Sequence, residues 1–504
     1  MGAEGLRYVC MSDLHLRAQN SVLSAIGADG MTVDKVTTSE VMTRLFAGLR
    51  ELVGRLAPDD ARPTLVLNGD ILEFALATDD TALSVFEQFM DQAFPVGGER
   101  LFDDRVLYLP GNHDHHLWET ARERQYAHHI KHTLGEGPLD EPWHTTKMLD
   151  PDASIEAEVL TAVVRRRARR DTVSIAVIYP NLGFVDPDSN QAVIFHHGHF
   201  TEPLYRLMST LQHDLFPAQQ PGPDIWDWES DNFAWIDFFW SALGRSGVVG
   251  ADVGALYTML QSPKALDWLA GNLSTSIAAR RGPRWFRSIT RFVVRRMLMF
   301  AIARAAPLER AHVTEPLSDR AEKGLQAYLA GPLLRQLQAE DPQRDQPGAT
   351  PAGGRECTFV FGHTHKPFQR IFPDIAGWTY PIRVLNTGGW VVDTIDPGEV
   401  QGSAVVLVAD DGAAVSLRLF TEPAGSGPTT PVTVAEPVVE PGTGAPIPET
   451  PMLGAWRRQV EAAVEADRSS WDAFTVAVTA AVAQRHEALP KIIDHAMKSH
   501  GATT

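Results

Sequence analysis

Residues 105–114 read RVLYLPGNHD, an apolar run that ends in a group of Gly, Asn, His and Asp. A short apolar run closed by Gly or Asn is typical of a buried β-strand that stops where polar residues begin. Taken alone, Gly111-Asn112 could equally be a simple turn. The segment therefore indicates a fold only if the same arrangement recurs in the chain.

The arrangement occurs four more times, in a fixed order along the chain. Further apolar runs stand at Arg7–Met11, Thr64–Leu67, Ala192–Phe195 and Cys357–Phe361. The polar groups that follow them are Asp13-Leu14-His15, Gly69-Asp70, His197-Gly198 and Gly362-His363-Thr364-His365. Strand ends that carry Asp, Asn and His in this way predict the catalytic edge of a β-sheet. Asp13 alone could instead cap a helix, but the set as a whole favours the catalytic edge.

The residue types at these strand ends suit a pair of divalent metal ions. Two ions roughly 3.5–4 Å apart can clamp a phosphoryl group and generate hydroxide near neutral pH. They require imidazole and carboxylate ligands, tolerate an amide, and need one carboxylate that bridges both ions. Asp13 and His15 are two residues apart, so on a regular strand they would point the same way, and His363 and His365 repeat this spacing. Because the groups contain no cysteine, a structural zinc site is disfavoured.

The order and identity of these residues resemble the calcineurin-like metallophosphoesterase superfamily. The matching positions are Asp13, His15, Asp70, Asn112, His113, His197, His363 and His365. The resemblance spans roughly residues 6–420, with long insertions between the matching segments. It implies a four-layer αββα sandwich of the α+β or α/β class, with the site at the strand ends.

The resemblance also implies a role for each residue. The first metal ion would be held by Asp13, His15, Asp70 and His365, and the second by Asp70, Asn112, His197 and His363. A hydroxide that bridges the ions would attack phosphorus in line. His113 would assist the leaving group, with Asp114 orienting its imidazole. The expected cofactor is two divalent ions, Mn²⁺ by resemblance, with Fe or Zn as alternatives.

Several other histidines lie beside these positions. His196 and His199 flank His197, and His197 is preferred as the ligand because it precedes Gly198. His199 is assigned to substrate binding. His115 and His116 extend the Asn112-His113-Asp114 run and are interpreted as supporting or surface groups.

Two branches of the superfamily are excluded by the residues after Asp70. Protein Ser/Thr phosphatases have a Gly-Asp-x-x-Asp-Arg-Gly pattern, but here Ile71-Leu72-Glu73-Phe74 follows Asp70. Purple acid phosphatases have Tyr at the position of Glu73. The stretches Gly69–Glu73 and Gly362–Pro367 look more like bacterial UDP-2,3-diacylglucosamine pyrophosphohydrolases, although His199 replaces their usual Asp and this chain is far longer.

The resulting functional prediction is dinuclear, metal-dependent hydrolysis of a phosphoester or pyrophosphate bond. The substrate would be a phosphorylated small molecule or a lipid-linked phosphate. One alternative enzyme is a nuclease or cyclic-nucleotide phosphodiesterase, since the same site cleaves many diesters. An alternative of another class is a metal-containing scaffold or partner-binding protein, which would have no need of His113 as an acid.

The length of 504 residues predicts a core domain with additions. The metallophosphoesterase domain is expected over residues 1–420, with helical insertions at 115–171 and 200–356, the second forming a cap. A Pro- and Gly-rich linker is expected over 421–451 and a helical segment over 452–504. This segment would either pack on the body or form a homodimer contact.

Composition indicates a cytoplasmic protein. The chain begins without an apolar leader, and its two cysteines, Cys10 and Cys357, lie inside predicted core strands. The net charge of −18 argues against general nucleic-acid binding.

A basic amphipathic helix is predicted near residues 284–300. Its arginines include Arg291 and Arg295, which are assigned to substrate binding, while Val293 and Met297 lie on the opposite face. Such a helix can also contact an anionic membrane surface peripherally or be a solvated lid helix. Its charges argue against a transmembrane span.

Overall fold

The computed structural model describes most of the chain. The ranges described are 5–57, 61–74, 79–133, 135, 138–166, 170–186, 189–216, 222–237, 241, 314–341, 351–423, 425, 427–440 and 444–499. The predicted basic helix with Arg291 and Arg295 lies outside these ranges, so its assignment stays a prediction.

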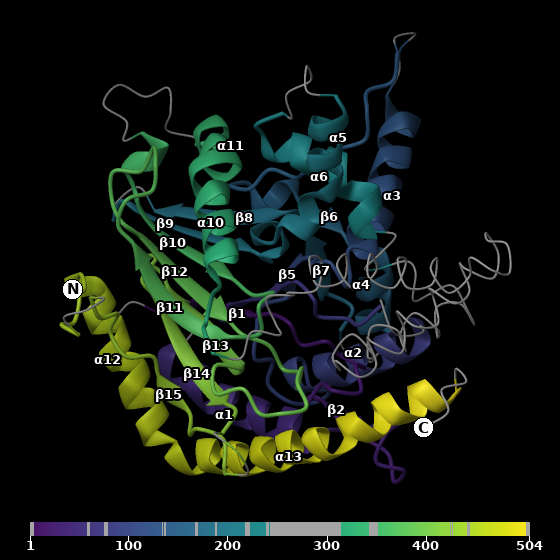
Figure 1. Cartoon of the computed structure of the whole chain (residues 1–504), viewed down its shortest axis with the longest axis vertical. Coiled ribbons are helices and arrows are strands. Elements are labelled where there is room, and N and C mark those ends of the chain that lie inside the picture. Colours follow the sequence, from purple (N-terminus) through teal and green to yellow (C-terminus); the bar gives the residue numbers. More distant parts are fainter. Residues whose placement is uncertain are drawn as a thin grey trace, which may run out of the picture.

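A large mixed sheet forms one half of the molecule's centre (Figure 1). In spatial order its strands are β15 (Thr433–Val434), β14 (Ala414–Thr421), β13 (Gly402–Ala409), β1 (Leu6–Met11), β4 (Thr64–Asn68), β5 (Arg105–Leu109), β7 (Ser174–Val177) and β6 (Ile155–Glu156). Strands β1, β4, β5 and β7 are parallel, with Cys10 beside Val66 and Val66 beside Leu107. The carboxyl ends of β1, β4 and β5 therefore lie next to one another.

A second sheet has the order β11 (Pro367–Phe372), β12 (Ile382–Thr387), β10 (Glu356–Phe361), β9 (Gln191–His196) and β8 (Asn181–Asp186). Strands β9, β10 and β12 are parallel, and Val360 pairs with both Phe195 and Leu385. A separate hairpin joins β2 (Ser24–Ile26) to β3 (Val33–Thr38). The strands predicted before the five polar groups are confirmed, with bounds that differ by at most one residue.

The two sheets pack face to face through a shared apolar layer. Alternate residues of β1 divide between the two faces of the large sheet, so Tyr8 and Cys10 enter this layer while Val9 and Met11 face the helices. The Tyr8 ring stacks on Phe184 of the second sheet at 4.0 Å between centroids. Both cysteines are buried and unpaired, as predicted.

Helices cover the other face of the large sheet. They are α1 (Glu40–Leu56), α2 (Asp79–Ala93), α4 (Glu158–Arg165), α12 (Pro451–Ala466) and α13 (Arg468–Ser499). Helix α1 begins where the Ser39 side chain accepts a hydrogen bond from the Met42 amide, and it buries an apolar face that includes Leu45 and Leu49. Figure 1 shows α13 running along the outside of α1, where the Trp471 ring packs on Gly48.

Helices also cover the face of the second sheet that is turned away from the large sheet. They are α6 (Ile225–Ile236), α10 (Asp319–Tyr328), a π-helical turn η7 (Leu329–Leu333) and α11 (Leu334–Glu340). Near them lies α5 (Leu207–Leu215), and α3 (His116–His132) follows the loop after β5. Short helical turns occupy η1 (Pro151–Ala153), η2 (His199–Thr201), η3 (Pro203–Arg206) and η8 (Ala352–Gly354). The order helices, sheet, sheet, helices confirms the predicted four-layer αββα sandwich.

The insertion predicted as a cap supplies part of this fourth layer. Residues such as Ile225, Leu325 and Leu329 pack against the outer face of the second sheet, together with Phe359 and Phe361. Whether the rest of the insertion covers the site stays a prediction, because residues 242–313 lie outside the described part. No helix in the described ranges is long and apolar enough to cross a membrane.

The region predicted as a linker contributes a strand to the large sheet. In β15, Val434 pairs with Leu417 of β14, and the nearby Val432 is fully buried. Beyond it, the Arg485 guanidinium of α13 donates hydrogen bonds to the carbonyl oxygens of Ser21 and Ser24. The C-terminal helices therefore pack on the body of this chain, one of the two arrangements left open by the sequence.

Candidate metal centre

The loops after β1, β4, β5, β9 and β10 bring the predicted polar residues together between the two sheets. We call the seven predicted ligands the strand-end cluster: Asp13, His15, Asp70, Asn112, His197, His363 and His365. Each is at most 2% exposed. His113 is equally buried beside them. Such a concentration of buried polar groups is costly unless each has a partner or a bound ion.

The backbone of the cluster is strained at several ligand positions. The φ angles of Asp13, His15 and Asp70 are 50°, 42° and 51°, and those of His363 and His365 are 68° and 58°. A left-handed conformation costs a non-glycine residue of order 1–3 kcal/mol, so it persists where the surroundings demand it. These turns bring the side chains together. The sequence predicted that alternation along a regular strand would do so, which is wrong because the residues lie beyond the strand ends.

Two glycines provide the space that the cluster needs. Gly69 has a φ of 86°, and a Cβ there would overlap the His197 ring. A Cβ at Gly111 would overlap the Asp70 carboxylate. Glycine is therefore required at these positions by close approach, and at Gly69 also by the backbone conformation.

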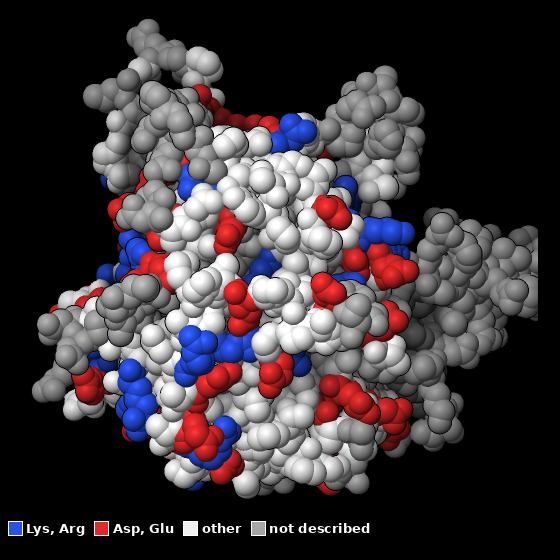
Figure 2. Space-filling view, turned by 90° about the vertical axis from the view of Figure 1, so that its left-hand side faces the viewer, with Lys and Arg blue, Asp and Glu red and all other residues white. Residues whose placement is uncertain are grey.

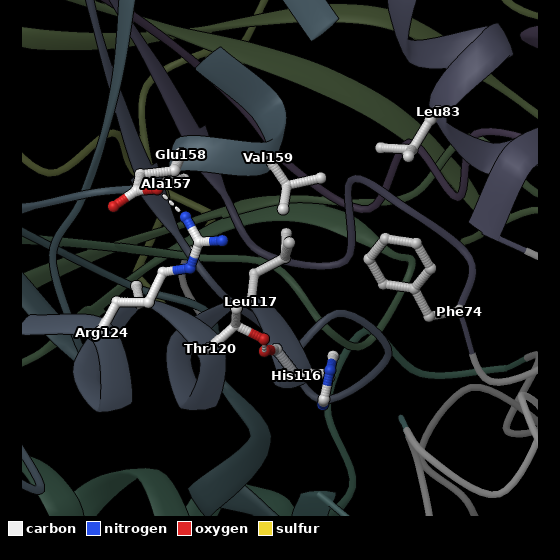
Figure 3. Close-up of a pocket in the computed structure, with 10 residues that line it drawn as sticks. Phe74, Leu83, His116, Leu117, Thr120, Arg124, Ala157, Glu158 and Val159 are labelled. Atoms are coloured by element: carbon white, nitrogen blue, oxygen red, sulfur yellow. Dashed lines mark hydrogen bonds and ion pairs between the residues drawn. The ribbon is translucent and has the colours of Figure 1, made fainter. Parts of the chain in front are cut away.

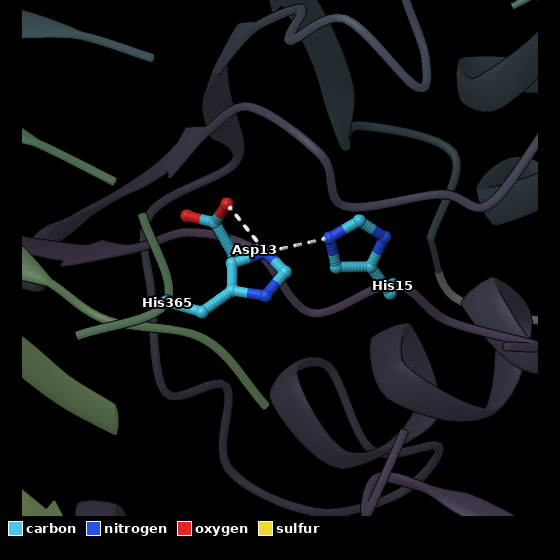
Figure 4. Close-up of side chains that lie close together, drawn as sticks. All are labelled: Asp13, His15 and His365. Atoms are coloured by element: carbon cyan, nitrogen blue, oxygen red, sulfur yellow. Dashed lines mark hydrogen bonds and ion pairs between the residues drawn. The ribbon is translucent and has the colours of Figure 1, made fainter. Parts of the chain in front are cut away.

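The first half of the cluster gathers around His365 (Figure 4). His365 Nε2 lies 3.4 Å from Asp13 Oδ1 and 3.1 Å from His15 Nε2. His15 Nε2 in turn lies 3.7 Å from Asp70 Oδ2. These four side chains are those assigned to the first metal ion from the sequence.

The second half gathers around His197 Nε2. This nitrogen lies 3.3 Å from Asp70 Oδ2, 3.0 Å from Asn112 Oδ1 and 3.3 Å from His363 Nδ1. Asp70 Oδ2 thus faces both halves, and it accepts no hydrogen bond from any residue in the described ranges. A carboxylate oxygen in this position is suited to bridge two cations.

Carboxylates on the far side of three imidazoles fix which nitrogen faces the cluster. His15 Nδ1 contacts Glu73 Oε2 at 2.8 Å, His363 Nε2 contacts Glu202 Oε1 at 2.9 Å, and His365 Nδ1 contacts Asp393 Oδ2. Because a carboxylate accepts the N–H, the opposite nitrogen presents a lone pair to the centre. The Nε2 atoms of His15 and His365 lie 3.1 Å apart, each with its lone pair toward the other. A cation bound by both nitrogens would stabilise this arrangement.

The prediction that Asp114 orients His113 is wrong. His113 Nδ1 contacts Glu73 Oε1 at 2.9 Å, so Glu73 supports both His113 and His15. The Asp114 carboxylate instead accepts hydrogen bonds from the Gly111 amide at 2.6 Å and the Ile71 amide at 2.8 Å, and from the Tyr108 hydroxyl. Asp114 therefore ties the loops after β4 and β5 together.

Charges inside the cluster shift several pKa values. Burial would raise the pKa of Asp70, but the His197 and His113 imidazoles outweigh it and hold that pKa well below its usual range. Burial would lower the pKa of His197, but the Asp70 carboxylate raises it to about 9. Burial, together with the charge of Asp70, raises the pKa of Asp114 to about 6. Metal ions and protons would thus compete for His197.

His199 lies behind the cluster, with its ring centroid 5.8 Å from that of His197. The side chain is fully buried, and burial beside other imidazoles holds its pKa well below the usual range. Neither ring nitrogen has a hydrogen-bond partner in the part of the chain that the structure describes. Its assignment to substrate binding stays a prediction.

Three carboxylates that contact the histidines of the site, Glu73, Glu202 and Asp393, were not predicted from the sequence to have this role. Glu73 stands in the Gly69–Glu73 stretch, where it served only to exclude the purple acid phosphatases. Asp393 follows the strand β12, and Glu202 follows η2. No local pattern marks Asp393 or Glu202, because each meets its histidine through the tertiary fold.

The fold and the site together define a metal-dependent phosphoesterase. The family model described as calcineurin-like phosphoesterase matches residues 6–247, which include Asp13, Asp70 and His113. This match supports the assignment of the chain to the calcineurin-like phosphoesterase superfamily, whose members use divalent metal ions to hydrolyse phosphoesters. His363 and His365 lie beyond the matched range, and the structure brings them to the same centre. No curated protein matches the chain.

Proposed function

We propose that the protein hydrolyses a phosphoester or pyrophosphate bond with a pair of divalent metal ions. The observation that carries this proposal is the position of Asp70 Oδ2, which lies 3.7 Å from His15 Nε2 and 3.3 Å from His197 Nε2. One carboxylate oxygen thus faces two separate sets of ligands. A pair of bound cations would supply an activated water nucleophile near neutral pH and offset the charge of the phosphoryl oxygens.

The side chains present fit such a pair. Asp13, His15, Asp70 and His365 would hold one ion, and Asp70, Asn112, His197 and His363 the other. This set of carboxylates, imidazoles and one amide, without thiolates, suits Mn²⁺, Fe or Zn. We propose Mn²⁺ first, on the resemblance of the motifs.

His113 is the proposed proton donor to the leaving oxygen. Its Nδ1 contacts Glu73 Oε1, and this carboxylate would orient the imidazole so that Nε2 can pass a proton to the leaving oxygen. The same carboxylate holds His15 through Oε2. Glu73 therefore couples the orientation of a proposed metal ligand to that of the proposed acid.

A pocket that begins at Phe74, the residue after Glu73, favours a substrate with an apolar part (Figure 3). Phe74, which follows Glu73, lines it together with Leu83, Leu117 and Val159, while an ion pair between Arg124 and Glu158 lies at its wall. The net charge of −18 and the mixture of both charge signs in Figure 2 favour a small or lipid-linked phosphate over a nucleic acid. As part of the same proposal, we place the protein near the UDP-2,3-diacylglucosamine pyrophosphohydrolases, whose motifs it resembles.

The proposed chemistry is tested with an aryl phosphomonoester and the matching phosphodiester in the presence of Mn²⁺. We expect turnover by the natural protein, a loss of about 10²–10⁴-fold in kcat for His113→Ala, and unchanged metal content in that variant. His128→Ala, on the exposed side of α3, is the matched control and should retain full activity.

The pattern of turnover then selects among the alternatives. Diester cleavage would direct the next panel to nucleotides and lipid-linked diphosphates, and monoester cleavage would identify a phosphatase. If His113→Ala loses its metal ions, or cleaves as fast as the control, the assigned role of His113 is wrong. Two bound metals without turnover of either ester would favour the scaffold alternative.

A further inference from the structure

A second group of metal-binding side chains lies outside the strand-end cluster. It joins the start of α3 to the end of α6, and we call it the helix-end cluster: His115, His116, Glu119 and Asp237. His116 Nδ1 lies 3.1 Å from Glu119 Oε2 and 3.7 Å from Asp237 Oδ1. His115 Nδ1 lies 3.5 Å from the same oxygen of Asp237. The potential ligand atoms of His116, Glu119 and Asp237 all lie within 4.8 Å of one another.

These distances match the spacing of ligands around one small cation. Donor atoms about 2.0–2.2 Å from a tetrahedral zinc ion are roughly 3.3–3.6 Å apart. Two imidazoles with two carboxylates are a donor set for a transition-metal dication, whereas Mg²⁺ and Ca²⁺ prefer oxygen ligands alone.

The charges of the helix-end cluster also favour a cation. Asp237 is the residue that follows α6, where the helix dipole disfavours a carboxylate and favours positive charge. Glu119 brings a second carboxylate to the same point, and Arg122 is the nearby basic residue. Hydrogen bonding alone is the competing explanation of the cluster.

We propose that the helix-end cluster is a third metal site, which binds a zinc-like dication through Asp237, Glu119, His116 and His115. The ion would join α6, in the long insertion, to the first turn of α3. Ser241 supports the same junction, since its hydroxyl accepts a hydrogen bond from the His116 amide at 2.9 Å. The site would thereby hold the insertion against the loop that carries His113.

This site is independent of the proposed catalytic reaction. None of its four residues belongs to the strand-end cluster, and two of its side chains are more exposed, at 29% for His116 and 26% for Glu119. It can therefore be tested by metal content alone, whether or not the protein hydrolyses a phosphoester.

The test is equilibrium dialysis of the full chain against micromolar Zn²⁺, followed by elemental analysis. We expect Glu119→Gln and Asp237→Asn to retain one zinc equivalent fewer than the natural protein. Glu123→Gln is the matched control, because Glu123 is exposed on the same helix and should leave the count unchanged. Zinc should also raise the Tm of the control more than that of Glu119→Gln.

Anomalous diffraction at the zinc edge locates the ion directly. A peak between His116 and Asp237 that is absent from Glu119→Gln supports the proposal. Equal zinc counts in Glu119→Gln and Glu123→Gln, or no peak at this position in zinc-loaded crystals, would overturn it. The partly exposed position of Glu119 keeps this comparison free of a folding defect, which the Tm of the metal-free variants checks.

Discussion

The strand-end cluster and the helix-end cluster both gather histidines and carboxylates, but the fold builds them differently. In the strand-end cluster, five candidate ligands have positive φ and every member is buried. In the helix-end cluster, His115 and Asp237 have ordinary right-handed helical backbone angles, and part of the group is exposed to solvent. The first cluster thus depends on strained loops between two sheets, whereas the second depends on how two helices meet. Function that demands precise geometry is expected in the first.

The largest predicted effect is that of Asp70→Asn. Because Asp70 Oδ2 faces both halves of the strand-end cluster, its loss should abolish binding of both catalytic ions and reduce turnover by about 10³-fold or more, since a catalytic metal contributes several kcal/mol. Elemental analysis and the ester assay measure these effects. Zinc at the helix-end cluster should remain, so simultaneous loss of metal from both clusters would show that the two clusters are not independent.

The next effect concerns the carboxylates behind the imidazoles. Glu73→Gln should weaken binding of the first ion by about 10–100-fold and also lower kcat, because Glu73 contacts both His15 and His113. Asp393→Asn should weaken metal binding by a similar factor but leave the pH–rate profile unchanged at saturating metal, since Asp393 contacts His365, a proposed metal ligand, through its Nδ1. Identical kinetic behaviour of the two variants would contradict the proposed double role of Glu73.

Metal affinity of the strand-end cluster should depend on pH. The Asp70 carboxylate raises the pKa of His197 to about 9 in the metal-free protein, so His197 is protonated at pH 7 and must lose that proton to bind a metal. Affinity for the second ion should therefore rise by up to about tenfold per pH unit from pH 7 and level off above pH 9. Calorimetric titration in buffers of different ionisation enthalpy measures the released proton. A pH-independent affinity between pH 7 and 9 would refute this competition.

The smallest predicted effect on chemistry is that of Asp114→Asn. The substitution replaces an acceptor of the Gly111 and Ile71 amides, so it should reduce the free energy of unfolding by about 1–3 kcal/mol. The pH–rate profile should keep its shape, because Glu73 and not Asp114 contacts His113. A shift of that profile in Asp114→Asn, with none in Glu73→Gln, would restore the role first expected for Asp114.

The sequence predicted the sandwich and the strand-end cluster because both follow from local patterns. Each of the five apolar runs is a strand, and each strand ends one or two residues before its polar group begins. Parallel strands then bring those ends together whatever the lengths of the insertions between them. This is why His363 and His365 could be grouped with Asp13 across about 350 residues.

Other features could not be predicted because they arise from tertiary contacts. Asp114 follows His113 directly, yet the tight turn aims its carboxylate at the Gly111 amide, and Glu73, 40 residues away, reaches the imidazole instead. Glu202 and Asp393 lie in loops without a recognisable motif. The helix-end cluster forms only because Asp237 meets the start of α3, where it contacts His115, a residue 122 positions earlier in the chain.

The central claim is that two metal ions share Asp70. Anomalous diffraction from Mn²⁺-loaded crystals of the full chain tests it most directly. We expect two peaks roughly 3.5–4 Å apart, both at bonding distance from Asp70, one beside His15 and His365 and the other beside Asn112 and His197. A single peak, or a pair of peaks of which only one contacts Asp70, would show that Asp70 does not bridge two metal ions.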